Sequence, residues 1–91
     1  MKISKEKRDR VAEQILNYLF SQSPKAVFTS YIAKDIARDE EFVKKLLYEL
    51  KKKGLVNEIK KNSEGIPYIR RLRWKLSDSA YTIYKQKSES Y

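Results

Sequence analysis

The chain has 91 residues with a formal net charge of +9, and a hydrophobic fraction of 41% allows one small core and a single domain. It contains no cysteine and no histidine, which excludes disulfides, thiolate chemistry, imidazole base catalysis and most transition-metal sites. No apolar run approaches the roughly 20 residues of a membrane span, and the charged start MKISKEKRDR does not read as a secretion signal. We therefore expect a cytoplasmic protein without a cofactor. Abundant Lys and Glu would suit an archaeal or heat-loving host.

The positive charge is concentrated in one third of the chain. Residues 1–43 carry eight basic and seven acidic side chains, whereas residues 44–75 carry eleven basic and three acidic ones, a balance of +8. Residues 76–91 are neutral in sum. Solubility alone does not require such clustering, so the pattern indicates a polyanionic partner, nucleic acid above all.

The first predicted helix runs from Lys5 to Phe20, with Ser4 as its N-cap. Pro24 cannot continue this helix, and the apolar residues 26–28 then fit a short strand. The buried side of the helix is predicted from apolar residues at helical intervals, namely Val11, Ile15, Leu16 and Leu19.

Two further helices are predicted on either side of a tight turn. Thr29 is expected to cap the second helix, over residues 29–37, and Asp39 to cap the third. Gly54 is expected to end the third helix, as glycine commonly does. The buried side of the third helix is predicted to consist of Val43, Leu46, Leu47 and Leu50.

Beyond Gly54 the apolar period changes to that of a strand, which predicts a β-hairpin with strands over residues 55–61 and 68–76. Alternation in the second strand separates a packing face (Leu72, Trp74, Leu76) from a charged face (Arg71, Arg73, Lys75). Trp74 is therefore expected to fill the core.

Ser77 is expected to cap a last helix over residues 78–86. We place a single domain over residues 4–86 and a polar tail over residues 87–91. The predicted fold class is α+β, mainly helical with a small β-hairpin, in the order helix, strand, helix, helix, strand, strand, helix.

The run IAKDIARDEEFVKKLLYELKKKGLV resembles the winged helix-turn-helix family of DNA-binding domains. WKLSDSAYTIY is likewise similar to the closing strand of the wing and the capped helix after it, so the resemblance covers about residues 8–86. The positions that carry it in the first run are Ile32, Ala33, Ile36, Val43, Leu47, Leu50, Gly54, Leu55 and Val56. Ala37 and Arg38 depart from the family pattern, which often has Gly and an apolar residue in this turn.

The resemblance implies that the third helix is a recognition helix in the major groove of double-stranded DNA. The acidic first turn of this helix, from Asp39 to Glu41, is explained most simply by helix capping. The candidate contacts on the outer surface of the helix are Lys44, Lys45, Tyr48 and Lys52, through phosphates or base edges. An ordinary solvated helix surface is the alternative interpretation.

The hairpin is the second candidate contact, to the DNA backbone or the minor groove. Arginine suits bidentate phosphate contacts better than lysine. The residues concerned are Lys60, Lys61, Arg70, Arg71 and Arg73. A solvated strand face is the competing explanation for the charged side of the second strand.

Many proteins of this family are two-fold dimers, so the resemblance implies a homodimer. The last helix offers Ala80, Tyr81, Ile83 and Tyr84 as an interface, although the same residues could cover the chain's own core.

We predict a DNA-binding transcriptional regulator associated with the nucleoid, and no enzyme, since no catalytic constellation is visible. An RNA-binding or ribosome-associated winged helix suits the same charge. A protein-interaction module in a larger assembly is a third hypothesis, but it does not explain the positive segment.

Overall fold

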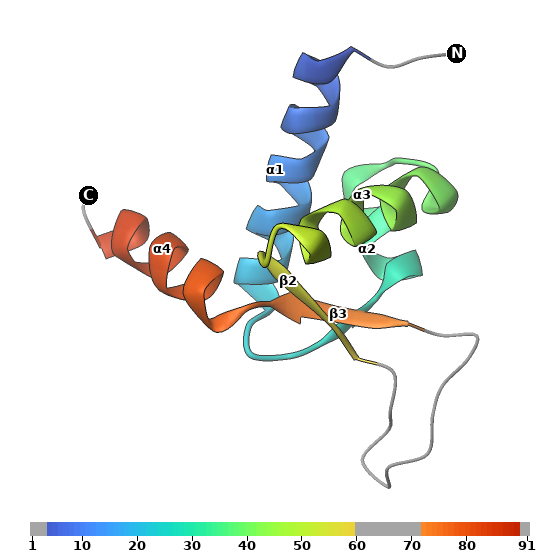
Figure 1. The fold of residues 1–91 in the computed structure, drawn as a ribbon. Helices are drawn as coiled ribbons and strands as arrows, with labels where there is room; N and C mark the ends of the chain where they lie inside the picture. Colours follow the sequence, from blue (N-terminus) through green and yellow to red (C-terminus); the bar gives the residue numbers. More distant parts are fainter. Residues whose placement is uncertain (1–3, 60–71, 90–91) are drawn as a thin grey trace, which may run out of the picture.

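The computed structural model describes residues 4–59 and 72–89 (Figure 1). The predicted element order and the α+β class are confirmed. The elements are α1 (Lys5–Gln22), β1 (Val27–Phe28), α2 (Thr29–Ile36), α3 (Glu40–Lys52), β2 (Val56–Ile59), β3 (Arg73–Leu76) and α4 (Asp78–Glu89). Leu55 and Leu72 lie just outside the strands into which they were predicted. Residues 60, 61 and 68–71 of the two predicted hairpin strands lie outside the described residues.

The three strands form one antiparallel sheet in the order β1-β3-β2. Trp74 on β3 lies opposite Val27 on β1 and opposite Glu58 on β2. The hairpin strands were predicted as partners, and the pairing of β1 with β3 adds a third strand that closes the other side of the sheet. This pairing joins the start of α2 to the base of the hairpin.

One hydrophobic core lies where α1, α2 and α3 pack against the sheet. Trp74 is its largest fully buried side chain, with 0% of its surface exposed, so its predicted role in the core is confirmed. The predicted alternation on β3 also holds, since Trp74 and Leu76 are buried whereas Arg73 and Lys75 are half-buried. The buried hydrophobic residues of the three helices are Val11, Ile15, Leu16, Leu19, Ile32, Ala33, Val43, Leu46, Leu47 and Leu50.

Thr29 has a different role from the predicted one. Phe28 occupies the N-cap position of α2 and makes no side-chain cap, while Thr29 is the first residue of the helix and is itself buried. The Thr29 Oγ1 accepts a hydrogen bond of 2.8 Å from the indole Nε1 of Trp74. The prediction of a Thr29 cap is therefore wrong, because a buried indole N–H needs an acceptor and this hydroxyl is the one within reach.

The other predicted helix caps are confirmed. Ser4 accepts from the backbone N of Lys7 at 3.3 Å and Asp39 accepts from that of Phe42 at 3.1 Å. Ser77 Oγ accepts from the backbone N of Ala80 at 3.2 Å. These bonds satisfy donors that the first helical turn would leave unpaired.

Gly54 and Ala37 end α3 and α2 in the same way. Gly54 has a φ of 76° and its N–H donates to the carbonyl of Lys51, while Leu55 N–H donates to that of Leu50, which is the Schellman pattern. Ala37 has a φ of 56°, a left-handed conformation that a Cβ disfavours. Ala37 thus adopts the left-handed conformation that glycine usually takes at the end of a helix.

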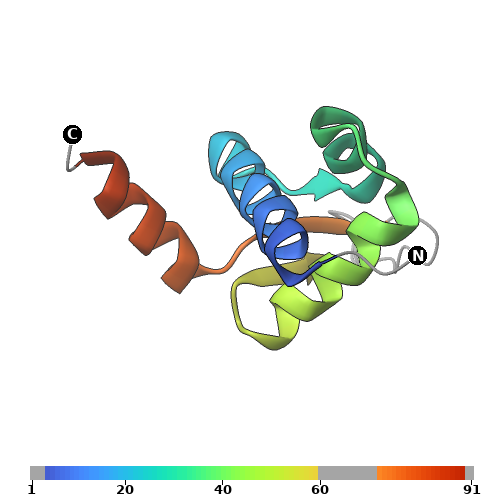
Figure 2. The ribbon, with the colours of Figure 1, turned by 90° about the horizontal axis from the view of Figure 1, so that it is seen from above.

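Helix α4 extends away from the body of the molecule (Figure 2) and runs to Glu89, further than the predicted end at residue 86. Its first half is held by aromatic packing, with Tyr81 and Tyr84 each against Phe20 at centroid distances of 5.6 and 5.8 Å. The Tyr84 hydroxyl donates to Glu13 Oε1 on α1 at 2.7 Å. Within the described residues, none of the helices is both long and apolar enough to cross a membrane.

Candidate nucleic-acid interface

The outer surface of α3 is defined by the side that the helix buries. Val43 and Leu47 are fully buried beneath it. At 3.6 residues per turn, Lys45, Tyr48 and Lys52 fall on the opposite side and are exposed. Lys44 lies on the flank of this surface and is half-buried. The structure therefore brings the four candidate residues of α3 onto one side of one helix, as the sequence predicted.

Ion pairs neutralise some neighbouring cations and leave others available. Lys51 Nζ lies 2.9 Å from Glu58 Oε1 on β2, and the Glu58 side chain is only 2% exposed. On the other flank of α3, Arg8 of α1 pairs with Glu49. Among residues 4–59 and 72–89, Lys44, Lys45 and Lys52 have no ion-pair partner.

Tyr48 is less free than its position suggests. Its ring packs edge-on against Trp74 at a centroid distance of 5.3 Å, and 37% of the residue is exposed. Burial raises the pKa of Tyr48, and so do a hydrogen bond to Glu58 and the charge of that carboxylate. Its hydroxyl is thus already engaged at the base of β2, and the exposed part of the ring is what Tyr48 offers to a ligand.

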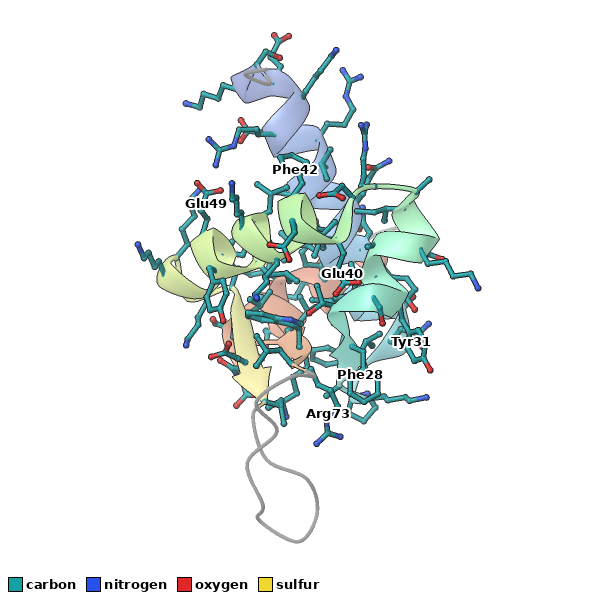
Figure 3. All side chains as sticks on the ribbon, turned by 90° about the vertical axis from the view of Figure 1, so that its right-hand side faces the viewer. Phe28, Tyr31, Glu40, Phe42, Glu49 and Arg73 are labelled. Atoms are coloured by element: carbon teal, nitrogen blue, oxygen red, sulfur yellow. The ribbon has the colours of Figure 1, made fainter. Side chains whose placement is uncertain are left out.

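Arg73 lies at the base of the hairpin on the face of β3 opposite to Trp74. It pairs in register with Phe28 of β1, and Figure 3 shows the two residues next to each other near one end of the molecule. The other predicted hairpin contacts (Lys60, Lys61, Arg70, Arg71) lie outside the described residues.

The start of α3 is acidic. Glu40 and Glu41 are exposed, and Glu40 is visible on the side of α3 towards α2 (Figure 3). Asp39 is occupied by its cap to Phe42. A phosphate would therefore meet repulsion at the first turn of α3 and attraction from Lys44 onwards.

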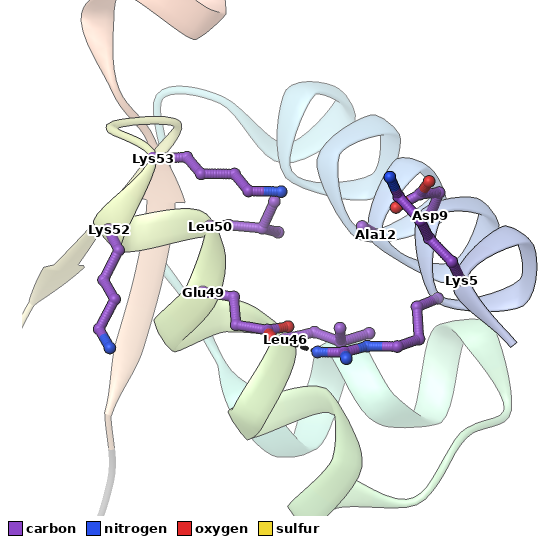
Figure 4. A pocket seen from close by; sticks show the side chains of 9 residues that line it. Lys5, Asp9, Ala12, Leu46, Glu49, Leu50, Lys52 and Lys53 are labelled. Atoms are coloured by element: carbon purple, nitrogen blue, oxygen red, sulfur yellow. Dashed lines mark hydrogen bonds and ion pairs between the residues drawn. The ribbon is translucent and has the colours of Figure 1, made fainter. Parts of the chain in front are cut away.

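A groove of about 700 Å³ separates α1 from the C-terminal half of α3 (Figure 4). Its lining mixes charges, and the Arg8–Glu49 pair ties the two helices together across it. The residues that line it are Lys5, Arg8, Asp9, Ala12, Leu46, Glu49, Leu50, Lys52 and Lys53. Lys52 therefore belongs both to the lining of this groove and to the outer surface of α3, and Lys53 follows it at the C-cap.

Sequence reasoning missed two residues of this region. Tyr31 on α2 is 58% exposed, and its place one residue before the buried pair Ile32 and Ala33 was the available signal. Glu58 alternates with Val56, which puts it on the inward side of β2. An inward carboxylate was the signal that a cation had to pair with it.

Solved structures share the arrangement of helices and strands described above. The S. aureus MepR–DNA complex matches with a TM-score of 0.74 and 22% identity over 92% of this chain. A putative DNA-binding protein from Ralstonia eutropha matches with a TM-score of 0.66 and 16% identity, and covers 86% of this chain. The PcaV transcriptional regulator from Streptomyces coelicolor, in complex with its natural ligand, matches with a TM-score of 0.63 and 17% identity over 81% of this chain.

The chain has a winged helix-turn-helix fold. In it α2 and α3 form the helix-turn-helix, and the hairpin of β2 and β3 forms the wing. This chain spans 66% of the length of the MepR chain in the DNA complex and 48% of PcaV, but 94% of the Ralstonia protein. No protein-family model matches the chain, and no curated protein matches it in sequence.

Proposed function

We propose that this winged helix binds double-stranded DNA through the outer surface of α3 and the wing, and acts as a transcriptional regulator on the nucleoid in the cytoplasm. The observation that carries the proposal is the set of lysines on α3, Lys44, Lys45 and Lys52, which have no ion-pair partner in the described part of the chain. They share one side of a helix next to the wing. Structural similarity to a MepR chain in complex with DNA supports DNA as the partner.

Electrostatic attraction supplies most of the affinity in this proposal. Lysine contacts to phosphate release counterions, and we expect contacts to about five to eight phosphates. Base reading would be modest, because Glu40 and Glu41 occupy the first turn of α3, where bases are approached most closely. A glutamate there can accept from the N4 amino group of cytosine.

The test is the affinity for an arbitrary duplex after replacing Lys44 and Lys45 with Ala. We expect a weakening of about tenfold to a hundredfold near 0.1 M salt, because each lost phosphate contact removes one released counterion. Lys25→Ala/Lys85→Ala is the matched control, since it removes the same charge from the loop after α1 and from α4. Equal affinities of the two double variants would show that the surface of α3 is not the interface.

A competition experiment separates DNA from RNA. The protein is first bound to a labelled DNA duplex, and unlabelled competitors are added at the same salt. The proposal predicts that duplex DNA displaces the label at a lower concentration than structured RNA does. The opposite order would support the RNA-binding alternative, whereas no binding to either would support a protein-interaction module.

We also propose that α4 mediates a homodimer. Ala80 is 2% exposed, and Tyr84 is half-buried and bonded to Glu13 of α1, so these two residues serve the chain's own fold. Tyr81 and Ile83 are 38% and 49% exposed and form the surface that a second copy would cover. Sedimentation of the parent and of Ile83→Lys at several concentrations tests this: a mass near 10.9 kDa throughout for the parent would contradict a stable dimer.

A further inference from the structure

Tyr31 is the most exposed of the large hydrophobic side chains in the described residues, at 58%. It lies on α2 beside the buried Ile32 and Ala33 but points away from them. Tyrosine is enriched at binding surfaces because its ring is rigid and its hydroxyl is a polar group that can bond a partner. Packing in the core explains why Ile32 and Ala33 are apolar, but it does not explain a large aromatic side chain at Tyr31.

The surroundings of Tyr31 hold its ring in place. Phe28 packs against it edge-on, with centroids 5.7 Å apart and an interplanar angle of 70°. Phe28 in turn lies opposite Arg73 in the β1–β3 register. Figure 3 shows Phe28, Tyr31 and Arg73 together near one end of the molecule, and we call these three residues the aromatic corner.

The charges near the aromatic corner favour an anion. Arg73 belongs to it, and Lys34, one turn further along α2, is exposed. Asp35 on α2 and Glu40 at the start of α3 are the exposed acids of the adjacent segments. Asp35 is likewise one turn from Tyr31, but its charge acts on Tyr18 of α1, where burial and then this charge raise the pKa of that phenol. Lys34 and Arg73 together outweigh this single acid by one charge.

We propose that the aromatic corner is a second contact to the backbone of the bound duplex, in which the Tyr31 hydroxyl donates a hydrogen bond to a phosphate. This inference rests on the proposed function. It places the phosphate on the DNA backbone beside the major groove that α3 is proposed to enter, on the side of the proposed wing contact. The Phe28 ring limits the rotation of Tyr31, so little side-chain entropy is lost when the bond forms. A backbone contact of this kind orients the protein and carries no sequence information.

Salt dependence distinguishes this contact from the lysine contacts. Tyr31 is neutral, so Tyr31→Ala should weaken binding to every duplex about tenfold while the slope of log K against log salt stays unchanged. Tyr31→Phe should show most of the same loss, because it removes only the hydroxyl. Arg73→Gln should instead reduce the magnitude of the slope by about one. Thermal melting of Tyr31→Phe should match the parent, because the variant keeps the ring contact with Phe28 and the lost hydroxyl belongs to an exposed residue.

Each alternative outcome contradicts the inference in a recognisable way. If Lys44→Ala/Lys45→Ala weakens binding but Tyr31→Ala does not, the proposed function stands and the aromatic corner is not a contact. Parent affinity in Tyr31→Phe would overturn the hydroxyl–phosphate bond. If Tyr31→Ala weakens binding to single-stranded DNA but not to a duplex, the aromatic corner stacks on bases and is not a duplex contact. A parent chain that does not bind duplex DNA would overturn both proposals.

Discussion

At the scale of single residues, the partner of the Trp74 indole shows how a buried polar group determines a neighbour. Trp74 Nε1 has no contact with water, and the hydroxyl of Thr29 accepts from it at 2.8 Å. The same hydroxyl lies 3.4 Å from the carbonyl of Leu72, to which it donates. Thr29 therefore joins α2 to the base of the wing.

Thr29→Val should lower the free energy of unfolding by about 1–3 kcal/mol, because the shape is kept while the buried N–H loses its acceptor. Denaturant unfolding of the two proteins measures this difference. Thr29→Ser keeps the hydroxyl and serves as the control, with a smaller loss expected. Equal destabilisation by Val and Ser would mean that the hydrogen bond contributes nothing.

Ala37 gives the opposite expectation. Its φ of 56° disfavours any residue with a Cβ, and glycine adopts this conformation without strain. Ala37→Gly should raise the free energy of unfolding by about 0.5–1 kcal/mol, after the greater freedom of glycine in the unfolded chain is counted. Ala12→Gly, inside α1, should lower it by about 1 kcal/mol and provides the control of opposite sign. A destabilised Ala37→Gly variant would contradict the left-handed conformation.

At the scale of elements, the attachment of α4 depends on Tyr84. Burial and the hydrogen bond to Glu13 raise the pKa of Tyr84 above its ordinary value of 10.0. In the unfolded chain Tyr84 loses its proton at lower pH than in the folded one. The contribution of Tyr84 to the free energy of unfolding is therefore fully present below pH 10.0 and is lost as pH rises above that value.

Tyr84→Phe should make the loss of stability above that pH shallower than in the parent. Near neutral pH the variant should be only slightly less stable, by about 0.5 kcal/mol, because the bond lies at the surface. Unfolding measured at several pH values tests this. An identical alkaline profile in parent and variant would mean that Tyr84 does not titrate differently in the folded chain.

The elements themselves were largely predictable. Helix α3 combines an Asp39 cap, a regular apolar side and Gly54, so local chemistry and packing indicate the same bounds. The role of Thr29 was not predictable, because a threonine before a helix reads as a cap until the distant indole of Trp74 is placed beside it. The extra turn of α4 was missed because its last residues are polar and carry no periodic signal.

At the scale of the whole molecule, the candidate interface was predictable in its outline and not in its pairings. Helical spacing placed Lys45 and Lys52 on the outer surface of α3. The neutralisation of Arg8 by Glu49 and of Lys51 by Glu58 depends on how separate elements pack, so no local pattern contains it. On α3 these pairs engage Lys51 and leave Lys44, Lys45 and Lys52 without an ion-pair partner in the described part of the chain.

The central claim is that this set of lysines faces a polyphosphate, and the salt dependence of duplex binding tests it most directly. For the parent we predict a slope of log K against log salt of about −4 to −7 between roughly 50 and 200 mM salt. Lys44→Ala/Lys45→Ala should reduce the magnitude of that slope by about two. Binding that does not depend on salt, or a double variant with the slope of the parent, would contradict the account.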